Sequence, residues 1–180
     1  MGYQPELIGG QLLLDLLNTV SWRLDDSRWI DLLSTSAALD DWCAAVGLSV
    51  PRNTKLEDVT RVRETAYLVV LPLARGEEPA EVDLEALQDL LVDALSRAKP
   101  TGVRPLDWTT DDVAATLALS AARLLEHEDL SRLRECQDDD CGWLFMDRSK
   151  NGSRRWCSSR DCGNRARARR HYQRVRAVQS

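Results

Sequence analysis

The C-terminal stretch from Cys136 to Ser180 reads CQDDDCGWLFMDRSKNGSRRWCSSRDCGNRARARRHYQRVRAVQS and decides how this end of the chain folds. It contains four of the five cysteines, in two C-x4-C pairs separated by fifteen residues: Cys136, Cys141, Cys157 and Cys162. Two close cysteine pairs on either side of a hairpin-length insert can present four thiolates to one tetrahedral Zn²⁺ ion. The sequence therefore predicts a structural zinc site, because four protein ligands leave no open position for catalysis.

Two disulfides or an iron–sulfur cluster could use the same four cysteines. Disulfides are disfavoured, because the first residues, MGYQPE, lack the basic and then apolar order of a secretory signal. No apolar run reaches the length of a transmembrane helix, so no membrane association is expected. These features predict a cytoplasmic protein, whose thiols stay reduced, and favour zinc over disulfides.

The insert between the cysteine pairs has the pattern of a hairpin. Gly142 permits a sharp turn beside the metal, and residues 143–146 form a short apolar strand. The dipeptide at 151–152, Asn-Gly, favours a tight turn, and residues 154–156 are the expected return strand.

A helix is expected to follow the hairpin. Ser158 and Asp161 form a capping box, and the helix runs to about Ala177 without a proline. At helical spacing, three residues form one narrow stripe that is expected to pack on the zinc module: Ala168, Tyr172 and Val175.

The same stretch resembles a CGNR zinc finger, which takes its name from the residues found here at 162–165. The words W-L-F-x-D-x-S, R-R-W-C and C-G-N-R occur in that order. The preceding region resembles the ABATE domain that accompanies this finger, through Gly9-Gly10 followed by LDLLNT at 14–19. The resemblance implies zinc binding and DNA binding in a stress-induced regulator of transcription.

The net charge of −5 hides a division between the two parts of the chain. Residues 131–180 hold 13 Lys and Arg against 6 Asp and Glu, whereas residues 1–130 hold 11 against 23. Such asymmetry marks the basic part as the surface for nucleic acid, because the acidic part would repel phosphates.

Double-stranded DNA is the expected partner, since Arg side chains can reach guanine edges and neutralise phosphates. The predicted contacts lie on the hairpin and on the last helix: Arg148, Lys150, Arg154, Arg155, Arg165, Arg167, Arg169, Arg170 and Arg174. Asn164 and Gly163 are expected to support the metal site, Asn164 by bonding a thiolate or by shaping the helix start. A basic face that docks on the acidic part of the chain, or on a protein partner, is the alternative.

Residues 1–130 have the apolar spacing of a helical domain. Helices are expected at 10–20, 36–46, 54–75, 83–98 and 111–126, with short extended segments at 28–30, 103–108 and 130–135. Thr54 and Thr110 are the expected helix caps. The predicted fold is mainly α, with a multi-helix domain at 1–130 and a small zinc-bound β-hairpin plus helix at 131–180.

The helical domain shows no catalytic pattern. It has no Gly-rich phosphate loop and no Ser/His/Asp order, so no enzyme activity is predicted. Asp15 and Asn18 are neighbours on a helix surface and are expected to form a polar pair or to contact a loop. Cys43 lies on an apolar stripe and is expected in the core.

These features predict a zinc-dependent, DNA-binding transcriptional regulator. Its finger would contact DNA, while the helical domain senses an unknown small-molecule ligand or associates into a homodimer. Two other functions use the same zinc site: an adaptor whose basic helix grips an acidic protein, and a redox sensor in which oxidation of the thiolates ejects zinc.

Overall fold

The structure is a computed structural model that describes residues 4–179. Six α-helices account for most of the regular structure in this range: α1 (Leu12–Leu17), α2 (Ser36–Ala45), α3 (Leu56–Arg75), α4 (Glu81–Arg97), α5 (Val113–His127) and α6 (Cys162–Gln179). The strands form three antiparallel pairs: β1 (Val20–Ser21) with β2 (Ile30–Asp31), β3 (Lys99–Val103) with β4 (Leu106–Thr109), and β5 (Leu133–Glu135) with β6 (Leu144–Met146). The mainly α fold is thus confirmed.

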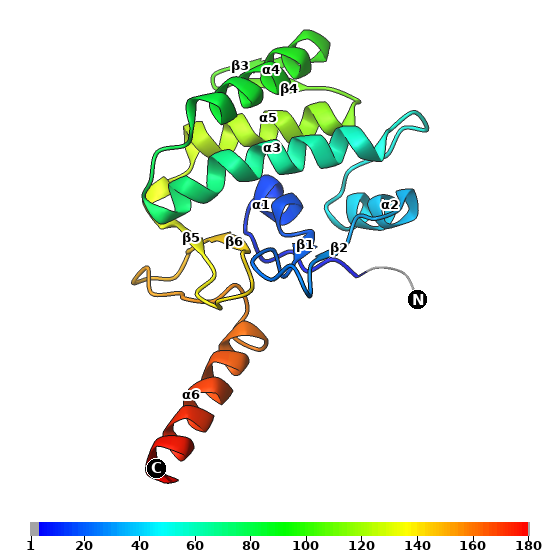
Figure 1. The fold of residues 1–180 in the computed structure, drawn as a ribbon. Coiled ribbons are helices and arrows are strands. Elements are labelled where there is room, and N and C mark those ends of the chain that lie inside the picture. Colours follow the sequence, from blue (N-terminus) through cyan, green and yellow to red (C-terminus); the bar gives the residue numbers. More distant parts are fainter. Residues whose placement is uncertain (1–3, 180) are drawn as a thin grey trace.

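Helix α5 is the centre of the helical body. It contacts α1, α3 and α4, and nine of its residues are buried, four of them alanines. Small side chains let helix backbones approach closely, so α5 can be surrounded without leaving voids. In Figure 1, α3, α4 and α5 lie side by side, with α1 below them and α2 next to α1.

Helix α1 is short but apolar around its circumference. Four of its five leucines, at 13, 14, 16 and 17, are fully buried. Gln11 caps the helix, because its side-chain oxygen accepts the Leu13 backbone N–H at 2.6 Å. The same side chain donates to the Ser120 carbonyl at 3.1 Å, which fixes α1 against α5.

Two predicted helix caps are wrong. Helix α3 begins after Lys55 without a side-chain cap, although Thr54 was the expected one. At α5 the cap is Asp112, which accepts the Ala115 N–H at 2.8 Å, while Thr110 accepts only the N–H of Asp112. As the N-cap of α5, the Asp112 carboxylate lies at the positive end of the helix dipole, which favours its negative charge.

Two extended segments also differ from the prediction. The region after α4 forms a complete β3–β4 hairpin, whose first strand begins at Lys99, ahead of the single extended segment predicted at 103–108. The segment at 130–135 begins with a single turn of 3₁₀-helix at Leu130–Arg132 and becomes strand β5 only at Leu133.

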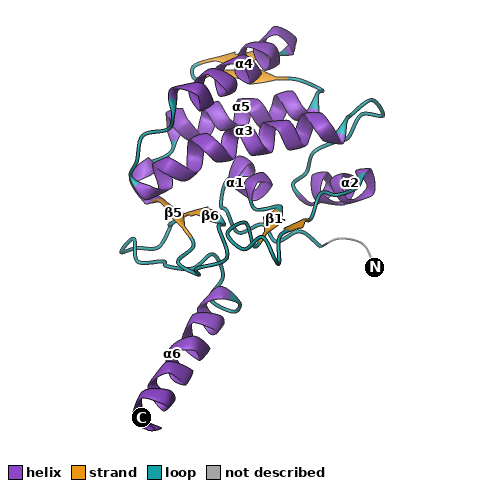
Figure 2. Ribbon diagram, in the orientation of Figure 1, coloured by secondary structure: helices purple, strands orange, loops and turns teal. Residues whose placement is uncertain are grey.

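The hairpin near the cysteines pairs differently from the prediction. Strand β6 pairs with β5, with Leu133 opposite Met146, and residues 154–156 form no strand. Figure 2 shows the segment between β6 and α6 as loop. The buried Asp147 explains this, because its carboxylate accepts the backbone N–H groups of Ser149 and Arg154, both at 2.9 Å. Asp147 thus closes a loop where a strand was expected.

Candidate metal centre

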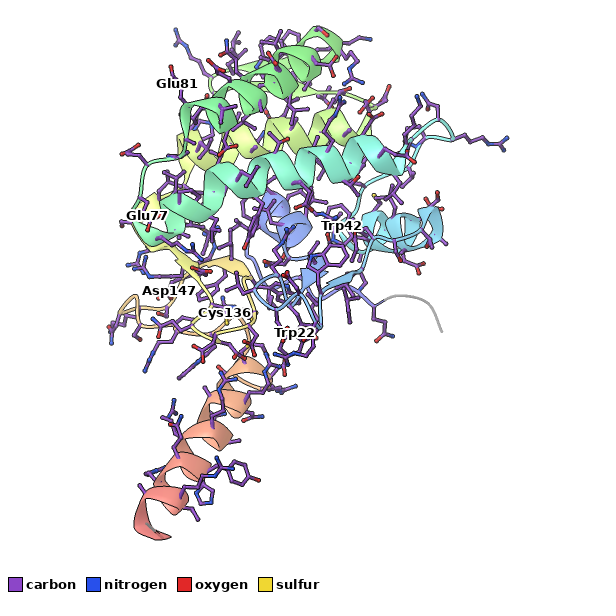
Figure 3. The ribbon with its side chains drawn as sticks, viewed as in Figure 1. Trp22, Trp42, Glu77, Glu81, Cys136 and Asp147 are labelled. Carbon is purple, nitrogen blue, oxygen red and sulfur yellow. The ribbon has the colours of Figure 1, made fainter. Side chains whose placement is uncertain are left out.

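Four cysteines from three segments converge between the helical body and α6. Cys136 and Cys141 lie in the connection between β5 and β6, Cys157 lies in the following loop, and Cys162 is the first residue of α6. All four are buried, and their sulfur atoms lie within 4.8 Å of one another. Figure 3 shows Cys136 at the junction from which α6 projects.

The geometry of the sulfur atoms fits a tetrahedral metal ion. The Sγ atoms of Cys157 and Cys162 are 3.3 Å apart, and those of Cys141 and Cys157 are 3.7 Å apart. Zinc–sulfur bonds of about 2.3 Å at tetrahedral angles place the sulfurs about 3.8 Å apart. All five cysteines are free thiols, so no disulfide competes for these ligands within residues 4–179. The four cysteines are therefore arranged to bind a metal ion.

A backbone N–H and a guanidinium group donate to the sulfur atoms of the cluster. The Cys157 backbone N–H donates to the Cys136 sulfur at 3.4 Å. The Arg165 guanidinium donates to the Cys162 sulfur at 2.9 Å. Negative sulfur is therefore stabilised by backbone and side-chain donors, as in a metal-thiolate centre.

Cys43 has no part in this cluster. It is fully buried in the helical core, as predicted, and burial raises the pKa of its thiol to about 11. A neutral thiol in an apolar environment behaves as a small hydrophobic residue.

Asp138 is a site residue that sequence reasoning missed. Its side chain is fully buried and pairs with two arginines of α6, Arg165 at 2.6 Å and Arg169. Burial would raise the pKa of this carboxyl, but its bonds to Arg169 and Arg165 have the larger combined effect. The pKa of Asp138 therefore lies below its usual value. The sequence places Asp138 between two of the candidate metal ligands, and it places Arg165 and Arg169 four residues apart on the last helix. Only the tertiary structure shows that Asp138 contacts both arginines.

Two family models match the chain. Residues 132–175 match the CGNR zinc finger, and residues 10–128 match ABATE, described as "Putative stress-induced transcription regulator". The second match covers more than half of the chain. The chain belongs to the ABATE family. The order of an ABATE domain followed by a CGNR finger confirms the predicted resemblance, and neither model is an enzyme family. No curated protein matches the chain.

The ABATE part holds the metal centre through Asn18. This buried side chain donates its amide N–H to the Leu144 carbonyl and accepts the Leu144 N–H, both at 2.8 Å. Of the two expectations for Asp15 and Asn18, a mutual polar pair is not formed, whereas a loop contact is, because Asp15 accepts the Gly9 N–H at 2.8 Å. Asn18 thus binds strand β6 as a neighbouring strand would, across 126 residues of sequence.

Further bonds join the ABATE part to the turn that carries Cys141. The Trp143 indole donates to the Val20 carbonyl at 2.7 Å, and the Tyr67 hydroxyl donates to the Gly142 carbonyl at 2.9 Å. Gly142 has a positive φ of 70°, as its predicted turn requires. A Cβ atom there would lie 2.8 Å from the Arg23 side chain, so the turn also needs glycine for space.

The basic residues of the loop are largely committed to structure. Arg154 donates to three carbonyl groups, those of Ile8, Trp156 and Cys157, at 2.5–3.2 Å. Arg148 pairs with Glu128 at 2.9 Å. The other two basic loop residues that were predicted to contact DNA are exposed, namely Lys150 and Arg155. Arg155 also donates to the Gln137 side chain at 2.5 Å.

The basic residues of α6 divide along the helix. Arg165 and Arg169 face the module through Asp138, as described above. Four others are exposed: Arg167, Arg170, Arg174 and Arg176. Of these, Arg167 donates to the Asn164 side chain and to the Ser159 carbonyl, on the exposed face of the first turns.

The predicted packing stripe of α6 is wrong. Tyr172 is 67% exposed and Val175 is 40% exposed, and Ala168 is also exposed. The helix instead buries its first turns, through Cys162, Gly163 and Ala166. The cause is geometric, because α6 projects away from the body instead of folding back along it (Figure 1).

Asn164 and Gly163 both lie at the start of α6. The Gly163 N–H donates to the Ser158 carbonyl at 2.9 Å. The Asn164 amide donates to the Arg160 carbonyl, and its oxygen accepts from Arg167 at 2.5 Å. These contacts shape the helix start, which was one of the two roles expected for Asn164. The Ser158 hydroxyl accepts the Asp161 N–H at 3.3 Å, whereas the Asp161 carboxylate pairs with Arg165 and so leaves the capping box half formed.

Proposed function

We propose that this ABATE protein is a zinc-dependent, DNA-binding regulator of transcription. One observation carries the proposal. Helix α6 is fixed to the cluster of four buried thiols at its first residue and projects into solvent with an arginine-rich, exposed surface.

Zinc is the metal that best suits these ligands. Four thiolates in a closed, buried site favour Zn²⁺, which takes tetrahedral sulfur coordination and has no redox chemistry of its own. Cys136, Cys141, Cys157 and Cys162 would hold the ion. The bound ion would supply a fixed crosslink between the β5–β6 turn, the loop and the start of α6.

The charge of α6 suits a polyanion. From Cys162 to Gln179 the helix contains six arginines and no acidic residue. Arg167, Arg170 and Arg174 lie on one side of it and are exposed. The acidic body would be held away from the phosphates, because α6 extends from the opposite side to α4 (Figure 1). A single projecting helix of this kind fits the width of the major groove.

The proposal gives the two parts different tasks. Helix α6 contacts duplex DNA, with Lys150 and Arg155 of the loop as additional phosphate contacts. The ABATE part holds the finger in place and offers its surface to a small-molecule ligand or to a second copy of the chain.

Fluorescence anisotropy with a labelled duplex tests DNA binding. We expect affinity to fall steeply between about 50 and 200 mM salt, since each neutralised phosphate adds about 0.9 to the salt slope. The variant Arg167→Ala/Arg170→Ala/Arg174→Ala should lower that slope by about 2–3 and weaken binding at least tenfold at low salt.

The matched control removes three exposed arginines from the helical body instead, as Arg52→Ala/Arg61→Ala/Arg104→Ala, and should bind DNA like the unaltered protein. Equal losses in both triple variants would indicate a nonspecific charge effect. An absence of binding at low salt, with zinc at one ion per chain, would overturn the DNA function and favour an acidic protein partner. Metal analysis of Cys43→Ala, which should keep its zinc, checks that the four clustered cysteines alone bind the ion.

A further inference from the structure

A small pocket leads from the surface to the metal centre. Its volume is about 130 Å³, and three of the four clustered cysteines line it: Cys141, Cys157 and Cys162. Trp22, Trp143 and Arg165 form other parts of its wall. Among the residues described, Cys136 is the clustered cysteine that does not line the pocket. Since a water molecule in the liquid occupies about 30 Å³, a molecule as small as hydrogen peroxide can enter.

Trp22 forms one wall of this pocket and has a strained backbone conformation. Its φ of 58° lies in the left-handed region, where a bulky residue is an outlier that its surroundings must enforce. Two guanidinium groups stack on its ring, Arg28 at 4.0 Å and Arg165 at 4.4 Å from the centroid. Arg165 also donates to the Cys162 sulfur, so Trp22 is linked to the centre through Arg165. Figure 3 shows Trp22 beside the start of α6.

The sulfur geometry selects the pair that can react. Cys157 lies 3.3 Å from Cys162 and 3.7 Å from Cys141, and all three line the pocket. In the zinc-bound centre both sulfurs would be thiolates, which is the form that attacks a peroxide. An oxidised sulfur at either Cys157 or Cys162 therefore has the other thiolate within immediate reach.

We propose that the metal centre is a hydroperoxide-sensitive switch, in which a peroxide entering beside Trp22 joins Cys157 and Cys162 in a disulfide. The inference rests on the proposed zinc occupancy and concerns the regulation of the same site. One thiolate sulfur attacks the peroxide, which breaks the O–O bond, forms a sulfenic acid and releases hydroxide. The second thiolate displaces a second hydroxide as the S–S bond forms. The two sulfurs lose two electrons in total, and the peroxide gains them.

The disulfide would release both the metal and the start of α6. Cys136 and Cys141 remain as ligands, and two thiolates are too few to retain a structural ion. Arg165 loses its thiolate partner at the first turn, where Asp138 also holds α6. The arginine helix would thus lose the anchor that orients it. A reductant would restore the thiols, because the disulfide is a reversible product.

The test begins with the full-length, zinc-loaded protein. Hydrogen peroxide is added below one equivalent, and zinc release is followed with a chromophoric chelator. Differential alkylation and mass spectrometry then identify the oxidised cysteines. We expect zinc release to parallel formation of the Cys157–Cys162 disulfide, with Cys136 still a free thiol, and dithiothreitol to restore zinc binding. A first disulfide that includes Cys136, or retention of zinc at excess peroxide, would overturn the switch. A protein purified without zinc would instead contradict the proposed function itself.

The pocket is tested with Trp22→Ala, which removes one of its walls and widens access to the sulfurs. Zinc release by peroxide should accelerate at least about threefold, since access controls the rate of thiol oxidation. The matched control is Trp29→Ala, in which an exposed tryptophan of the same loop is removed and the rate should not change. Equal rates in all three proteins would exclude this route to the sulfurs. Mapping of the disulfide in the unaltered protein remains decisive if Trp22→Ala does not fold.

Discussion

At the scale of single residues, Asn18 has the largest consequence for its size. A side-chain amide carries one donor and one acceptor side by side, which matches the N–H and C=O of one residue on a strand edge. Asn18 uses both on Leu144, where the edge of β6 would otherwise be buried unpaired. Its neighbour Thr19 accepts a bond from the buried Arg63 at 3.0 Å. The LDLLNT sequence therefore supplies the side chain that connects α1 to the finger.

Asn18→Ala should lower the free energy of unfolding by about 2–4 kcal/mol, because it leaves two buried backbone groups without partners. Urea denaturation followed by circular dichroism measures the change. Asn53→Ala, at an exposed asparagine, should change stability by less than about 0.5 kcal/mol. If the two variants were equally stable, Asn18 would not be the connection that its contacts indicate.

At the scale of elements, the β1–β2 ribbon is fixed to α3 by a buried ion pair. Asp31 on β2 accepts two bonds from Arg63 on α3, both at 2.7 Å, and Arg63 is only 2% exposed. The loop between these strands carries Trp22, so this pair also positions one wall of the pocket beside the cysteines. The buried residues of α6 lie in its first turns, so its orientation depends on the metal centre and on Asp138.

Asp31→Asn should lower the free energy of unfolding by about 2–4 kcal/mol at pH 7, because it removes the charge that pairs with the buried Arg63. Glu64 remains in contact with Arg63 in this variant. Burial would raise the pKa of Asp31, but the bonds from Arg63 lower it below the ordinary 3.8. A lowered folded-state pKa stabilises the protein above the unfolded value, and this contribution is lost as the pH falls through the folded value.

The stability difference between Asp31→Asn and the unaltered protein should therefore be constant from about pH 8 to 5 and shrink below about pH 4. Urea denaturation across this range measures it. Asp26→Asn removes a charge from an exposed site of the same loop and should show no such difference. A difference that grew on acidification would contradict the assigned sign.

At the scale of the whole molecule, the hydrophobic core runs through both matched regions. Leu133, Leu144 and Met146 of the β5–β6 hairpin are buried in the same cluster as the helices. Phe145 and the four clustered cysteines form a second, smaller cluster. Successive residues of β6 thus face opposite sides, one towards the helical core and one towards the metal centre. No helix among residues 4–179 is long and apolar enough to span a membrane.

This shared core predicts that the finger does not fold well alone. A peptide of residues 131–180 should bind Zn²⁺ at least about tenfold more weakly than the full chain, because it loses the contacts that orient its ligands. Competition with a chromophoric chelator measures both affinities. The full-length Asn18→Ala variant should fall between the two. Equal affinities for the peptide and the full chain would show that the finger is independent of the helices.

The helices and the candidate metal ligands could be predicted from the amino-acid sequence, since both depend on spacing along the chain. Apolar residues three and four apart placed the five helices of residues 1–130 to within a few residues, and two C-x4-C pairs identified four cysteines that the fold brings together. The tertiary structure alone decided the partners. Asn18 with Leu144 and Asp138 with Arg165 are separated by 126 and 27 residues, and no local pattern encodes such contacts. The direction of α6 could not be predicted either, because the exposed residues Ala168, Tyr172 and Val175 have the spacing of a buried stripe.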